Sequence, residues 1–118
     1  MVRRARLLLA FQAVLFATAS LVHAGTLLSG YEHSRAATAE GVIALELLAG
    51  LVAGLIWSAS ARTAALVAQG FALLGTLVGA FTIAVGVGPQ TTADYVFHAT
   101  VLVVLVWGLV AVWKSSRD

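Results

Sequence analysis

Four long apolar segments, separated by short polar stretches, place the strongest limit on what this 118-residue chain can fold into. Each segment has roughly the 20 residues that an α-helix needs to cross the hydrocarbon core of a bilayer. Hydrophobic residues make up 61% of the chain and charged residues 10%, which is far more apolar than a soluble domain. The sequence therefore predicts an all-α membrane protein, a single domain over residues 1–118, with spans over about residues 5–28, 37–57, 63–85 and 93–113.

The basic residues predict how these spans are oriented. If the chain crosses the membrane four times, all but one of its seven basic residues fall on one side. They are Arg3, Arg4, Arg6, Arg62, Lys114 and Arg117, whereas Arg35 falls on the other side. Because cytoplasmic segments carry the excess of Lys and Arg, both termini are expected inside the cell. Short connections make consecutive spans antiparallel neighbours, so we expect an up-down-up-down bundle, N-in/C-in, as a multi-pass protein of the plasma (inner) membrane.

Small residues mark the expected helix contacts. Gly50-x-x-x-Gly54 and Gly75-x-x-x-Gly79 each place two glycines on one helix face, which lets two backbones approach closely. These faces could pack within one chain, form a homo-oligomer or contact a larger membrane complex. The other expected partner is the lipid bilayer. We expect no nucleic acid, because the basic residues lie at span ends, where they set topology.

Three ionisable residues lie well inside the expected spans, away from their ends, where a charge costs about 3 kcal/mol or more. His23 lies six residues before Ser29, Glu46 lies six after Glu40, and His98 lies six after Thr92, which places each roughly 9 Å inside the outer boundary at a rise of about 1.5 Å per residue. Their equal depths predict that the three side chains converge inside the bundle, near its outer face.

Three further polar residues, Glu40, Asp94 and Tyr95, are expected around this layer. Asp94 precedes His98 by four residues, so its carboxylate could hold the second ring nitrogen of the imidazole. Glu40 and Asp94 are also expected in first helical turns, where the helix dipole favours an acid. Thr91-x-x-Asp94 is typical of a capping box.

The three buried residues suggest several kinds of site. Two histidines and a carboxylate suit zinc, copper or non-haem iron, and His23 and His98 alone could be the axial ligands of a b-type haem. The trio could also serve only to hold the helices together through interhelical hydrogen bonds. In a third interpretation Glu46 changes protonation during transport.

The leading interpretation is an outer-leaflet His/Glu pocket, made by His23, Glu46 and His98, that binds a metal ion, a haem or a small ligand. One alternative is a proton-coupled small-molecule transporter that acts as an oligomer, and another is an accessory or structural subunit of a larger membrane complex. The chain has no cysteine and no metalloprotease, phosphate-binding or dinucleotide-binding motif. We therefore assign no catalytic residue and expect a protein that is not an enzyme.

Three segments carry a resemblance to known proteins. Ala36-Ala-Thr-Ala-Glu-Gly41, Gly86-Val-Gly-Pro-Gln90 and Asp94-Tyr-Val-Phe-His98 resemble a group of small uncharacterised bacterial membrane proteins with four spans. The resemblance covers most of the chain and implies the four-span fold, but no activity. The chain is also similar to small four-helix haem proteins of the cytochrome b type in having histidines on separate spans. With two such histidines, at most one haem is expected.

Overall fold

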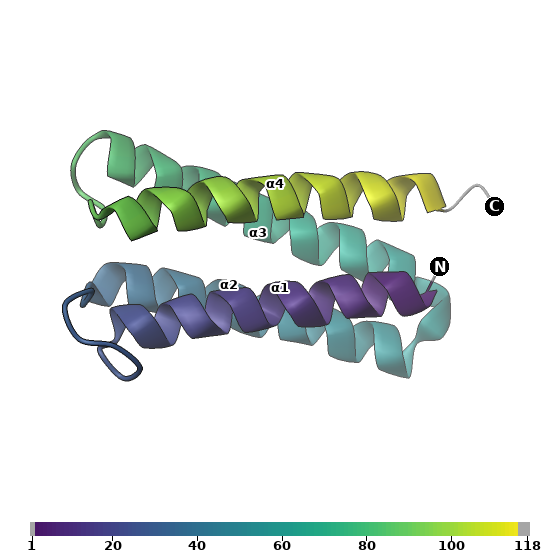
Figure 1. Ribbon diagram of the computed structural model, residues 1–118. Coiled ribbons are helices and arrows are strands. Elements are labelled where there is room, and N and C mark those ends of the chain that lie inside the picture. The colour runs from purple at the N-terminus through teal and green to yellow at the C-terminus, as the bar shows by residue number, and fades with distance from the viewer. Residues whose placement is uncertain (1, 116–118) are drawn as a thin grey trace.

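The computed structural model describes residues 2–115, and all regular structure within this range is helical. Four long helices in this range lie side by side: α1 (Val2–His23), α2 (Ser34–Ile56), α3 (Ala61–Ala84) and α4 (Thr92–Lys114) (Figure 1). A short 3-10 helix, η1 (Ser58–Ser60), connects α2 to α3. Each of the four helices is long and apolar enough to cross a membrane, as the sequence predicts.

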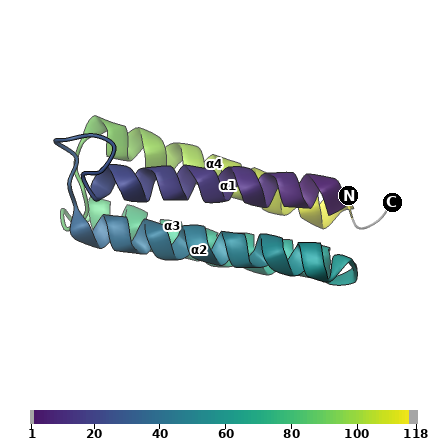
Figure 2. The ribbon, with the colours of Figure 1, turned by 90° about the horizontal axis from the view of Figure 1, so that it is seen from below.

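The helices form a bundle with two distinct ends. The start of α1, the end of α4 and the η1 connection lie at one end, which we call the terminal end (Figures 1 and 2). The connections over residues 24–33 and 85–91 lie at the opposite end, which we call the loop end. Helices α1 and α2, α2 and α3, and α3 and α4 pack against each other, and α1 also contacts α3 and α4. The fold thus brings four separate segments together at the loop end.

The core is narrow and the outer surface is apolar. Leu9, Leu47 and Leu105 are fully buried along the bundle axis, together with many alanines. Large aliphatic side chains also point outward, for example Leu45 at 69% exposed and Val103 at 70% exposed. A helix that is apolar on all sides is typical of a lipid-facing bundle, because lipid replaces water around its outer face.

Basic side chains gather at the terminal end. Arg3, Arg4 and Arg6 lie in the first turns of α1, Arg62 lies near the start of α3, and Lys114 ends α4, whereas Arg35 lies at the loop end. Arg117 lies outside the described residues. Two of these side chains bind backbone oxygens of neighbouring helices: Arg6 Nη2 donates to Gly54 O at 2.7 Å, and Arg62 Nη2 donates to Trp113 O at 3.2 Å. Two of the basic residues at this end therefore also link neighbouring helices through hydrogen bonds.

The predicted glycine contacts form within the chain. A Cβ added to Gly50 would lie 2.7 Å from Ala68 Cβ of α3, and one added to Gly75 would lie 2.9 Å from Ile43 Cδ1 of α2. Neither separation is compatible with a real side-chain contact. The two glycines thus let α2 and α3 approach closely, which is the intramolecular alternative among the contacts expected from the sequence.

Two helix ends differ from the sequence prediction. Helix α1 ends at His23, five residues before the predicted boundary at Leu28. Gly25 adopts a φ of 79°, and the N–H groups of Gly25 and Thr26 donate to Val22 O and Leu21 O. This is a Schellman motif, in which a glycine with positive φ ends the helix.

Helix α2 begins earlier than predicted, at Ser34 rather than Ala37. His33 precedes it in an extended conformation, and its Nδ1 accepts a hydrogen bond from the Ala36 N–H at 3.2 Å. An imidazole thus caps α2 in place of the usual hydroxyl or carboxylate. The earlier start adds almost a full turn to α2 at the loop end.

Candidate functional site

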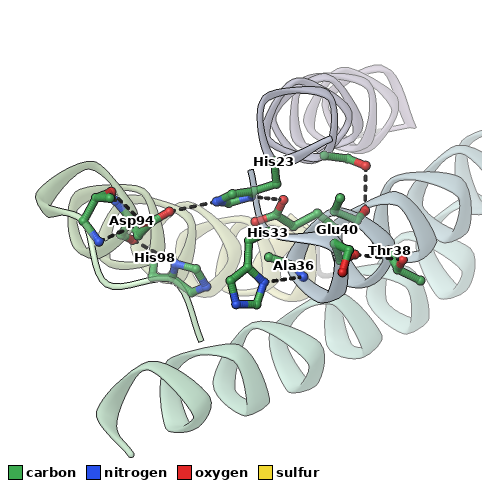
Figure 3. A network of polar contacts seen from close by, with 11 residues as sticks. His23, His33, Ala36, Thr38, Glu40, Asp94 and His98 are labelled. Carbon is green, nitrogen blue, oxygen red and sulfur yellow. Dashed lines mark hydrogen bonds and ion pairs between the residues drawn. The ribbon is translucent and has the colours of Figure 1, made fainter. Parts of the chain in front are cut away.

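Three buried ionisable side chains form a hydrogen-bonded row across the loop end of the bundle. His23 of α1 lies between Glu40 of α2 and Asp94 of α4 (Figure 3). His23 Nδ1 is 2.6 Å from Glu40 Oε2, and His23 Nε2 is 2.8 Å from Asp94 Oδ1. Each of the three residues is 5% exposed. We call this arrangement the His23 triad, and it connects three helices through one imidazole ring.

The proton content of the triad follows from its geometry. An ionised carboxylate can only accept hydrogen bonds, whereas each imidazole nitrogen either donates or accepts. Both His23 nitrogens face a carboxylate oxygen, so either the ring carries two protons or one carboxylic acid donates to it. In either state both ring nitrogens are engaged, and charge-assisted hydrogen bonds of this kind are short and strong.

Local structure places each member of the triad. The Schellman motif at Gly25 makes His23 the last residue of α1. Asp94 closes the predicted capping box: Thr91 Oγ1 accepts from the Asp94 N–H, and the Asp94 carboxylate accepts from the Thr91 N–H at 2.9 Å. The capping box is confirmed, and it holds the carboxylate in a fixed position beside His23.

Glu40 has a different place from the one expected. Because α2 begins at Ser34, Glu40 lies in the second helical turn and does not contribute to the first. Its carboxylate instead contacts the His23 ring across the α1–α2 interface. Ser20 Oγ strengthens the same interface by donating to Ala37 O at 2.6 Å.

The equal depths predicted for His23, Glu46 and His98 are not observed, because the helix boundaries differ. His23 ends α1, and His98 lies six residues into α4, or about 9 Å. Glu46 lies twelve residues into α2, or about 18 Å along its axis. Glu46 has no hydrogen-bond partner within residues 2–115, and its Oε2 is buried. The trio is therefore not brought together at one level.

His98 takes part in a separate contact. Its Nδ1 lies 2.8 Å from the backbone oxygen of Asp94, so the main chain, and not the expected Asp94 carboxylate, holds the ring. The ring also packs edge-on against Phe97. Gly79 of α3 leaves room for it, since a Cβ there would lie 3.1 Å from His98 Nε2. Tyr95 stays outside the site and donates to Gln90 Oε1 at 2.9 Å.

The arrangement gives no support to the metal and haem interpretations. Among residues 2–115, no three His, Cys, Asp or Glu side chains are grouped so that they could hold a metal ion. A haem ligated by two histidines needs a free nitrogen on each ring. His23 offers none, because both of its nitrogens are bonded to carboxylates.

A cavity of about 240 Å³ lies beside the triad, between α2, α3 and α4. Its wall is mostly apolar and includes Phe16, Ile43, Val87 and Phe97. The polar residues in the wall are His33, Arg35, Glu40, Thr76, Thr82 and His98. An apolar cavity with a few convergent polar groups is the usual form of a small-molecule site.

One polar atom in this wall lacks a partner. Glu40 Oε2 binds His23, but Glu40 Oε1 is buried and has no hydrogen bond within residues 2–115. A buried oxygen without a hydrogen bond is costly by about 1–3 kcal/mol, and by more when it is charged. Glu40 thus lines the cavity and has one buried oxygen that no donor of the described residues satisfies.

A second cavity lies on the other side of the triad. It has a volume of about 340 Å³ and is lined by residues of α1, of α4 and of the connection between α1 and α2, among them His23, Asp94, Tyr31 and Phe97. Glu40 therefore faces one cavity while Asp94 faces another, and the His23 ring lies between the two carboxylates.

A further polar contact, not predicted from the sequence, lies deeper in the bundle. Gln12 Nε2 of α1 donates to Gln69 Oε1 of α3 at 2.9 Å, and both side chains are 0% exposed. Gly108 of α4 packs directly on this pair, since a Cβ there would overlap Gln69 Oε1. Two glutamines within apolar spans are themselves a signal for such a contact, because each needs a partner in lipid.

Comparisons with protein-family models, with curated proteins and with solved structures find no match to this chain. Its function must therefore be inferred from the fold and from the geometry of the loop end.

Proposed function

We propose that this chain is a four-span membrane protein that binds a small molecule in the cavity between α2, α3 and α4. The observation that carries the proposal is Glu40, a residue of the cavity wall whose Oε1 is a buried acceptor without a partner among residues 2–115. A donor on a bound molecule would satisfy this oxygen, as is usual for buried polar groups. The apolar remainder of the wall would hold the body of the molecule.

The orientation of the protein determines on which side of the membrane the cavity lies. In our proposal the helices run up-down-up-down in the plasma membrane with both termini in the cytoplasm. The basic residues at the terminal end support this orientation, because positively charged segments stay inside. The loop end, and with it the cavity, would then lie in the outer leaflet and receive its ligand from outside the cell.

The test is a fragment screen by ligand-observed NMR on the purified protein in mild detergent. Fragments of about one ring should bind to the wild type and lose their signal in Ala39→Phe, which fills the cavity from an exposed wall position. Glu40→Gln should weaken binding of donor fragments about tenfold or more, since a hydrogen bond to a charged group contributes about 1.5–3 kcal/mol.

Glu46→Gln is the matched control. It removes a carboxylate from the same helix, but Glu46 does not line the cavity. Binding should therefore match that of the wild type. If the fragments bind equally to Ala39→Phe, or if Glu46→Gln weakens them as much as Glu40→Gln does, the cavity is not the binding site.

Proton-coupled transport is a second candidate, favoured by the position of the triad between two cavities. A proton that leaves Glu40 could pass through the His23 ring to Asp94, because each transfer follows an existing hydrogen bond. In this version of the transporter interpretation the triad, rather than Glu46, changes protonation.

This second function predicts proton movement coupled to a bound molecule. In proteoliposomes with a trapped pH dye, a gradient of benzylamine or benzyl alcohol should change the internal pH at a rate that Asp94→Asn lowers at least tenfold. Asparagine keeps an acceptor for Thr91 and cannot take up the proton. Equal rates in wild type, Asp94→Asn and protein-free liposomes would leave the protein as a binding protein only.

A further inference from the structure

We infer that the loop-end cavity selects molecules whose polar head donates hydrogen bonds, that is, an amine or a hydroxyl on a small apolar body. This inference rests on the proposed binding function and names the class of ligand. It depends on whether each polar atom in the cavity wall still has a hydrogen or a lone pair available.

Glu40 offers an acceptor in either proton state of the triad. If its carboxylate is ionised, both oxygens accept, and Oε2 is already bonded to His23. If Glu40 is instead the acid that donates to His23, its proton lies on Oε2, and Oε1 remains a carbonyl oxygen. Glu40 Oε1 therefore accepts in both cases and has no partner within the described chain.

His98 also offers an acceptor. Its Nδ1 faces the backbone oxygen of Asp94 at 2.8 Å, and a carbonyl can only accept, so Nδ1 carries the hydrogen. The neutral ring then has a lone pair on Nε2, which no residue of 2–115 engages. The tautomer of His98 is thus determined by the backbone of α4.

The hydroxyl hydrogens of the two threonines of α3 in the cavity wall are already engaged in hydrogen bonds. Thr76 Oγ1 donates to Ala72 O and Thr82 Oγ1 donates to Gly79 O, both at 2.7 Å. Each hydroxyl keeps its lone pairs, so within the cavity wall it acts as an acceptor. The inner polar atoms of the cavity are therefore all acceptors.

Donors are confined to the more exposed part of the wall. His33 Nδ1 accepts from the Ala36 N–H, so the hydrogen of the neutral ring is on Nε2, and the Arg35 guanidinium is exposed. The titratable groups in or beside the cavity wall are His33, which caps α2, Arg35 and Glu40 on α2, His98 on α4, and His23 and Asp94 of the triad. The polar side chains that α3 contributes to the wall are Thr76 and Thr82. A carboxylate ligand would meet donors near the opening and only acceptors inside.

The size of the cavity restricts the body of the ligand. About 240 Å³ lies slightly below the roughly 300–1,000 Å³ of sites for drug-sized molecules. Phe16 and Phe97, whose ring centroids are 5.9 Å apart in an edge-on pair, both line it. A molecule with one ring and one donating head group fits this description.

Four probes with the same ring test the inference: benzylamine, benzyl alcohol, benzyl methyl ether and benzoate. Dissociation constants are measured by ligand-observed NMR on the full chain in detergent, for wild type, Glu40→Gln, Glu46→Gln and Ala39→Phe. Benzylamine or benzyl alcohol should bind at least about tenfold more tightly than the ether and benzoate, as expected for one hydrogen bond to a charged acceptor. Which of the two binds more tightly identifies the head as cationic or neutral.

Glu40→Gln should reduce or reverse the preference for donor head groups, because the glutamine amide can place an N–H₂ donor where Oε1 was. Glu46→Gln should preserve the preference. The inferred preference for hydrogen-bond donors is wrong if the ether or benzoate binds as tightly as benzylamine and benzyl alcohol, or more tightly. If Ala39→Phe abolishes that binding, the proposed binding function still holds. If none of the four probes binds in a way that Ala39→Phe abolishes, both the inference and the proposed function fail.

Discussion

Replacing His23 with alanine should lower the free energy of unfolding by about 3–5 kcal/mol, the usual cost of removing one partner from a buried ion pair. The change leaves Glu40 and Asp94 buried without their shared donor, although the Asp94 carboxylate still accepts from Thr91. It also removes the side-chain hydrogen bonds that link the end of α1 to Glu40 of α2 and to Asp94 of α4. Unfolding by SDS in mixed micelles, followed by circular dichroism, measures the loss.

A triple variant separates the cost of unpaired charge from the loss of packing. His23→Leu combined with Glu40→Leu and Asp94→Asn removes the charges together and keeps an acceptor for the capping box. Replacing a buried ion pair with apolar groups is often neutral or stabilising, so this variant should regain most of the lost stability. A His23→Ala protein within about 1 kcal/mol of the wild type would show that the triad contributes little to the fold.

Replacing Gly108 with alanine should lower the free energy of unfolding by about 2–4 kcal/mol. The added Cβ overlaps Gln69 Oε1 and would lie 2.8 Å from Gln12 Nε2, so either α4 moves outward or the Gln12–Gln69 hydrogen bond breaks. Both outcomes are costly, since interior packing is dense and two buried amides would lose a partner. The same SDS titration measures the change.

Gly70→Ala is the matched control, because nothing lies within 4 Å of a Cβ at that position. It should leave stability unchanged or raise it slightly, as alanine is the better helix former. Gly108→Ala should also cost less in a Gln69→Ala background, where the obstructing amide is gone. If Gly108→Ala and Gly70→Ala behave alike, α4 does not pack on the glutamine pair.

The helix boundaries show which helix ends hydropathy predicts correctly and which it does not. Gly86 and Gly25 end α3 and α1 through the same motif, with φ values of 80° and 79°. The end of α3 is predicted correctly from the sequence to within one residue, because Pro89 follows it. The predicted end of α1 is wrong because Leu27 and Leu28 continue the apolar run beyond the last helical hydrogen bond.

This boundary error carried over to the candidate site. A shift of five residues moves a side chain by about 7 Å along a helix, so depths counted from the hydropathy boundaries grouped residues that the structure places at different levels. His23 was correctly singled out as buried, and Asp94 as a capping residue. Glu40 was expected at a helix start, whereas the structure pairs it with His23 in the second turn of α2.

The sequence by itself determined that the described chain forms four long apolar helices and that the basic residues of the described chain collect at one end. These properties depend on composition and on short-range order along the chain. Only the tertiary structure decided which polar side chains meet. In a membrane helix the lipid-facing and core-facing sides are both apolar, so hydropathy does not specify the rotation of each helix about its axis. That rotation sets His23 between Glu40 and Asp94, and leaves Glu46 without a partner among residues 2–115.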